Sequence, residues 1–166
     1  TGTRSVRHDR PKEYRLGKRT DLSTGLQELD QLLRGLISGD NLVWRVDRVE
    51  DYKVFVKPYC AHGLASGRHV VYLRYASHPP LITEDDFDGQ VTIYELDPRV
   101  GFEPFLDTVH DAIERTPRDA YYIFDSLSSL AETWYSDQML CNFFMLTCPY
   151  LYDHGDIAYF ALLRDL

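Results

Sequence analysis

Three side chains in this sequence are candidates for contact with a phosphate or another small anionic ligand: Arg48, Lys53 and Asp125. Arg48 and Lys53 follow a short apolar segment, residues 42–46, and Asp125 ends a second one, residues 120–125. If both segments are parallel strands of an α/β sheet, their carboxyl ends form the edge where such sheets bind ligands. We therefore expect any remnant of a nucleotide or anion site to include these three residues.

The segment between Gly39 and Lys53 is unsuited to phosphate. A phosphate-binding loop needs glycines so that several backbone N–H groups can converge on the anion at a helix N-terminus. No glycine follows Gly39 in this segment, and Asp47, Glu50 and Asp51 would repel phosphate. A lone lysine without backbone donors binds anions weakly, so Lys53 has an alternative role as a surface partner of Glu50 or Asp51.

The hydrophobic pattern predicts alternating helices and strands. Leucines at helical spacing, with Ser23 or Thr24 as a cap, indicate a first helix that runs to Arg34. The expected strands are residues 42–46, 69–75, 91–96, 120–125 and 157–163. The other expected helices are residues 52–64, about 102–116 and 137–152. Pro58 should kink the helix of residues 52–64 or delay its start. This alternation predicts an α/β fold with a mostly parallel sheet and helices on both faces.

Composition limits the classes of partner. At 166 residues, the chain is expected to hold one domain, residues 21–166, after a basic N-terminal arm, residues 1–20. Residues 1–19 carry seven basic and two acidic side chains, whereas the whole chain has a net charge of −8. An acidic body disfavours nucleic acid as a partner. The sequence has no membrane-spanning run, and its three cysteines lack zinc or disulfide spacing, which favours a cytoplasmic protein.

Other residues that could do chemistry have simpler interpretations. Ser126, Ser128 and Ser129 lie near Asp125 but outside any Gly-x-Ser-x-Gly elbow, which disfavours a serine hydrolase. The six histidines lack metal-ligand spacing. The acidic residues between 84 and 88 could bind a cation, although a solvated loop explains them as well. The alternative role of Asp125 is to cap a turn at residues 126–129.

The segment from Ser23 to Leu36 resembles the opening signature of the KaiC/RecA-like ATPases, in which Thr-Gly, Leu-Asp, Leu-Leu and Gly recur at this spacing. Residues 122–128 resemble the Walker B strand of that family, and residues 61–73 and 155–163 resemble neighbouring elements. The resemblance covers about residues 20–164 and implies a RecA-like P-loop NTPase fold. It also implies that Asp125 would help to hold magnesium and that ATP would be the ligand.

The departures from that family concern its catalytic parts. An ungapped comparison places Tyr52 at the phosphate-loop lysine and Lys53 at the magnesium-binding hydroxyl, and a shift by one residue places Lys53 and Val54 there. Residues 74–77, Arg-Tyr-Ala-Ser, stand where the family has acids that activate water. The loss of the phosphate cradle, the magnesium hydroxyl and the catalytic acid would remove most of the rate enhancement. We expect side chains to fill the space between Tyr52, Lys53 and Asp125.

The sequence therefore favours a pseudo-ATPase: a non-catalytic KaiC/RecA-like domain that regulates or scaffolds through contact with a protein partner or an adjoining domain. It is expected to need no cofactor. Residues 142–152 resemble degenerate KaiC-like domains joined to phosphoenolpyruvate synthase-type modules, and a fold of this type usually continues with further strands, so we expect a longer protein. Two alternatives stay open: a nucleotide or anion sensor with a remodelled site, and an ATPase completed in trans by another subunit of an oligomer.

Overall fold

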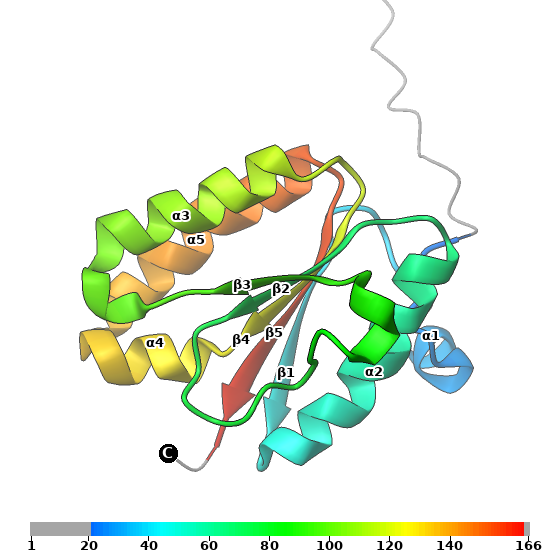
Figure 1. Cartoon of the computed structure of the whole chain (residues 1–166), viewed down its shortest axis with the longest axis horizontal. Coiled ribbons are helices and arrows are strands. Elements are labelled where there is room, and N and C mark those ends of the chain that lie inside the picture. Colours follow the sequence, from blue (N-terminus) through cyan, green and yellow to red (C-terminus); the bar gives the residue numbers. More distant parts are fainter. Residues whose placement is uncertain (1–20, 165–166) are drawn as a thin grey trace, which may run out of the picture.

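The centre of the molecule is a parallel five-stranded sheet. The computed structural model describes residues 21–164 and orders the strands β1-β5-β4-β2-β3 (Figure 1). Every neighbouring pair runs parallel. The strands are β1 (Asn41–Val46), β2 (Val70–Arg74), β3 (Thr92–Glu95), β4 (Tyr121–Asp125) and β5 (Ile157–Leu163).

Helices cover both faces of this sheet, which confirms the predicted α/β class (Figure 1). On one face lie α1 (Gln27–Leu33) and α2 (Val49–Ala65); on the other lie α3 (Phe102–Arg115), α4 (Leu127–Trp134) and α5 (Asp137–Asp153). Two short 3-10 helices, η1 (Asp86–Gly89) and η2 (Pro98–Val100), lie in the connections on either side of β3. The expected basic arm of residues 1–20 lies outside the described residues.

Strand β4 lies in the middle of the sheet and is buried along its whole length. All five of its residues are buried, because helices lie on both of its faces. Its side chains alternate, so that Tyr121 and Ile123 join the core under α2 while Tyr122 and Phe124 join the core under α3 and α5. The register then places Asp125 at the carboxyl end of β4, beside Arg74 at the end of β2.

The first helix differs from the prediction. Helix α1 begins at Gln27, and its N-cap, Leu26, makes no side-chain cap bond. The hydroxyl groups of Ser23 and Thr24 instead bond to the carboxylate of Asp30, which also accepts a hydrogen bond from the Thr24 backbone N–H at 2.8 Å. The predicted cap was therefore wrong, because one carboxylate inside the helix holds both hydroxyl groups of the preceding segment.

Helix α2 begins earlier than predicted, and Pro58 neither delays its start nor ends it. Its first turn contains Glu50 and Asp51, which were expected to belong to the loop before the helix. Negative charge is favourable in the first turn of a helix, where unpaired N–H groups point outward. The acidic residues that disfavour phosphate thus support the start of α2.

Helix α4 was missed. The expected turn after Asp125 is instead the start of this helix. Ser128 accepts a hydrogen bond from the Leu163 backbone N–H at 2.8 Å, which ties the helix to the end of β5. At the other end, Trp134 is half-buried and donates from Nε1 to the Pro98 carbonyl at 3.0 Å, whereas Tyr135 is exposed.

Candidate functional site

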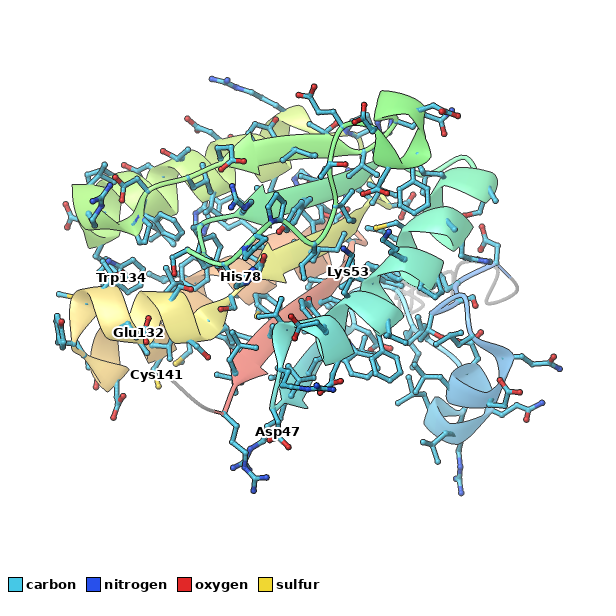
Figure 2. The ribbon with its side chains drawn as sticks, turned by 60° about the horizontal axis from the view of Figure 1, so that its bottom comes forward. Asp47, Lys53, His78, Glu132, Trp134 and Cys141 are labelled. Atoms are coloured by element: carbon cyan, nitrogen blue, oxygen red, sulfur yellow. The ribbon has the colours of Figure 1, made fainter. Side chains whose placement is uncertain are left out.

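A cavity of about 360 Å³ opens at the carboxyl ends of the strands. The chain leaves β1 toward α2 on one face and leaves β4 toward α4 on the opposite face, which is the arrangement that forms a crevice in open α/β sheets. Figure 2 shows Lys53 on α2 and Glu132 on α4 on either side of this space, with His78 between them. The lining residues are Asp47, Arg48, Val49, Glu50, Lys53, Ser77, His78, Pro79, Pro80, Leu81, Ser129, Glu132 and Leu163.

Two of the three candidate residues, Arg48 and Lys53, line this cavity. Arg48 is exposed and pairs with Asp51 at 3.2 Å. The expected surface pair between Lys53 and Glu50 or Asp51 is absent from the part of the chain that the structure describes, because Asp51 pairs with Arg48. Lys53 therefore keeps its ammonium group available to the cavity.

Asp125 does not line the cavity. Its side chain is only 1% exposed, and both carboxylate oxygens are bonded by other side chains. Oδ2 accepts a hydrogen bond from the Tyr72 hydroxyl at 2.5 Å, and Oδ1 accepts one from His78 Nε2 at 2.7 Å. The expected role of Asp125 as a cap for residues 126–129 was wrong, since its carboxylate points to β2 and the loop after it.

His78 is the residue that sequence reasoning missed. Its Nδ1 lies 2.8 Å from the Pro79 carbonyl, and its Nε2 lies 2.7 Å from Asp125. A carbonyl and a carboxylate both accept, so this geometry satisfies both ring nitrogens when the imidazole is protonated. Burial lowers the pKa of His78, but the hydrogen bond and charge of Asp125 raise it by more, so the pKa lies above its usual 6.5. The only signal in the sequence was a histidine beside two prolines after an apolar strand.

The loop that carries His78 is itself held in place. Arg74 donates to the His78 carbonyl at 3.0 Å and makes two bonds to Glu95, at 2.8 and 2.9 Å. Arg74 is the first of the four residues that replace the expected acidic segment of the family. Its position at the end of β2 links β3, through Glu95, to the loop over Asp125.

Tyr52 lies buried near Asp125 and does not line the cavity. Its side chain is buried in α2, and its pKa is raised well above the usual value by burial and then by the nearby charge of Asp125. Side chains therefore fill the space around Asp125, as expected, but an open cavity remains on the Lys53 side. The prediction of a filled site is correct for one half of the region only.

The charge of the cavity is mixed. Arg48, Lys53 and His78 face Asp47, Glu50 and Glu132, and no glycine of residues 21–164 lines the space. Converging backbone N–H groups, the usual means of holding a phosphate, have no glycine-rich turn to supply them. The cavity suits a ligand that carries both signs of charge, or a small anion bound by side chains alone.

The residues present do not form the magnesium site that the family resemblance implies. A cation at Asp125 would have to displace His78 or Tyr72, and the position of the family's hydroxyl ligand is occupied by Lys53 or Val54. Within residues 21–164, no three His, Cys, Asp or Glu side chains lie close enough together to hold a metal ion. In the acidic loop, Asp86 bonds to the Thr83 backbone N–H at 2.9 Å and pairs with Lys57 at 3.4 Å.

Comparison with known proteins assigns no family: no family model matches this chain, and no curated protein is significantly similar to it. None of the helices in the described part of the chain is both long and apolar enough to cross a membrane. The function is therefore argued from the site itself.

Proposed function

We propose that this chain is a non-catalytic α/β domain of the RecA/KaiC-like type that acts by contact with a protein partner or an adjoining domain. The observation that carries the proposal is that both oxygens of the buried Asp125 carboxylate already have hydrogen-bond partners. A buried carboxylate bonded to a protonated histidine and a tyrosine hydroxyl already has its charge balanced, so a magnesium ion gains little by replacing them.

The remaining family positions support the same proposal. Tyr52 is buried where an ATPase needs an extended lysine, and Arg74 binds Glu95 and the His78 loop where the family has a catalytic acid. Each substitution contributes contacts to the folded state. The residues that would catalyse phosphoryl transfer have thus been replaced by residues that stabilise the domain.

A second candidate function is a sensor for a small anion or a nucleotide in the cavity. One observation favours it: Lys53 faces a space of about 360 Å³ without an ion-pair partner among the described residues. Such a ligand would be held by Lys53 and Arg48, and it would not reach Asp125 while His78 covers that carboxylate.

Isothermal titration with ATP and with ADP, each with magnesium, tests the first proposal. We expect no binding in the micromolar range and no hydrolysis, whereas micromolar binding accompanied by hydrolysis would contradict it. The same titrations decide the second candidate when they are repeated on Lys53→Ala and on a matched control, Lys57→Ala, on the same helix. A sensor predicts binding without hydrolysis that Lys53→Ala weakens by about tenfold or more and that Lys57→Ala leaves unchanged.

A further inference from the structure

The cavity at the carboxyl ends of the strands has charged side chains of opposite sign on its two walls. Lys53 of α2 lies on one side of the space and Glu132 of α4 lies on the other (Figure 2). Neither side chain has an ion-pair partner within residues 21–164. A single ligand that carries both signs of charge could therefore pair with both walls at once.

Most of the other charged side chains in the lining already have a partner. Arg48, Asp47 and His78 each contact a group that can balance them, at 3.2, 3.5 and 2.7 Å. Glu50 has no such contact among the described residues, but it precedes Lys53 by three residues on the same helix and so lies on the side of the cation. Lys53 and the carboxylate of α4 are therefore the opposed groups that meet no competing contact.

Apolar side chains form much of the remaining surface of the cavity. They are Val49, Pro79, Pro80, Leu81 and Leu163. The loop that supplies three of them is held by the bond from His78 to Asp125 and by the bond from Arg74 to the His78 carbonyl, so the site is largely formed before a ligand arrives. The volume of about 360 Å³ is near the lower end of the roughly 300–1,000 Å³ range of small-molecule sites. The cavity suits a compact ligand with a hydrocarbon part.

We propose that this cavity binds a small zwitterion with an aliphatic body, of the class of an apolar amino acid or dipeptide. The carboxylate of the ligand accepts a hydrogen bond from Lys53, and its ammonium group donates one to Glu132. The hydrocarbon part covers the prolines and leucines between these two groups. Val49, the first residue of α2, also lines the cavity, so the positive end of that helix adds to the attraction for the carboxylate.

The acidic side chains of the cavity favour a zwitterion over a purely anionic ligand. A phosphate brings negative charge alone, so it would pair with Lys53 but would be repelled by Glu132 and Glu50. A zwitterion pairs with both walls and leaves no charge of its own unpaired. The inference rests on the second candidate function, a ligand held by Lys53 in this cavity, and it names the chemistry of that ligand.

Isothermal titration of the full chain with matched probes tests the inference. The probes are leucine and the dipeptide alanyl-leucine, each compared with its C-terminal amide, which lacks the carboxylate, and with its desamino analogue, which lacks the ammonium group. We expect a dissociation constant below about 1 mM for at least one of the two zwitterions. Both of its analogues should bind at least about tenfold more weakly, because each leaves one wall of the cavity unpaired.

Combined changes in protein and ligand locate each charge. Lys53→Gln should weaken the zwitterion by at least about tenfold and abolish the difference between the zwitterion and its amide, since the ligand carboxylate then has no partner. Glu132→Gln should likewise abolish the difference between the zwitterion and its desamino analogue. The controls Lys57→Gln, on the same helix as Lys53, and Glu50→Gln, in the same cavity, should leave both differences in place.

Three results would overturn the inference: no binding of either zwitterion at millimolar concentration, equal binding of a zwitterion and one of its analogues, or zwitterion binding that Glu132→Gln does not change. Titration with inorganic phosphate and with ATP separates this failure from that of the second candidate function. Binding of phosphate or ATP that Lys53→Ala weakens, without binding of a zwitterion, would leave the sensor in place. The absence of every one of these ligands would contradict both.

Discussion

At the scale of single residues, the acid that ends β4 is bonded by two other side chains of the same chain. The sequence identified Asp125 as the acid at the end of a strand. It could not identify the partner of Asp125, because His78 lies 47 residues away and reaches it only through the pairing of β2 with β4. Tyr72 contacts the same carboxylate from β2. A sequence shows which acid is present, whereas the fold determines what neutralises it.

Asp156 is a second buried acid, and it gives a prediction at this scale. Burial raises its pKa to about 7, and only Oδ1 has a partner among the described residues, the Ala120 N–H at 2.9 Å. The folded protein keeps the proton up to about pH 7, whereas the unfolded chain releases it near its ordinary pKa of 3.8. The free energy of unfolding should therefore decrease as the pH rises from 3.8 to about 7. The decrease is up to about 1.4 kcal/mol for each unit that separates the two pKa values.

Asp156→Asn removes this titration. We expect urea unfolding to show the variant more stable than the unmodified protein, by a margin that grows from pH 5 to pH 8. The control Asp107→Asn, at an exposed residue of α3, should change the free energy of unfolding by less than about 0.5 kcal/mol. An equal change in stability for Asp156→Asn at both pH values would show that the folded protein does not raise the pKa of Asp156.

At the scale of elements, the hydrophobic pattern of the sequence predicted the strands correctly but did not predict where the helices begin. All five strands were predicted within one or two residues, because β2, β4 and β5 are buried and nearly continuous in apolar residues and the more exposed β1 and β3 still consist mainly of apolar or β-branched residues. The start of α2 was misplaced because acidic residues that repel a phosphate also favour a helix N-terminus. Helix α4 was missed because its first residues, Leu127 to Ser129, resemble a polar turn. The cavity lies between these two helices, so its shape could not be predicted from the sequence.

Gly63 determines how closely α2 approaches the sheet. A Cβ atom at this position would lie 2.7 Å from Tyr121 Cδ2 and 2.8 Å from Val70 Cγ2. Gly63→Ala should therefore lower the free energy of unfolding by roughly 1–3 kcal/mol, because the overpacking cost exceeds the gain of about 1 kcal/mol in helix propensity. Chemical denaturation measures this change. Val54→Ala, on the exposed side of α2, should stay within about 0.5 kcal/mol, and equal effects of the two substitutions would contradict the packing argument.

At the scale of the whole molecule, one parallel sheet separates two cores and holds the cavity at the carboxyl ends of its strands. The sequence indicated this side of the sheet through the order of strands and helices. It could not indicate the strand order β1-β5-β4-β2-β3, which is a property of the assembled sheet.

We propose that His78, and not a metal ion, balances the charge of Asp125. Nitrogen NMR of the His78 ring tests this most directly, with His78→Gln to assign the signal. We expect both ring nitrogens to be protonated at pH 6.5, a pKa above 6.5, and no change when magnesium and ATP are added at millimolar concentration. A ring that is neutral at pH 6.5, or one that loses its contact with Asp125 when magnesium and ATP are added, would contradict the account.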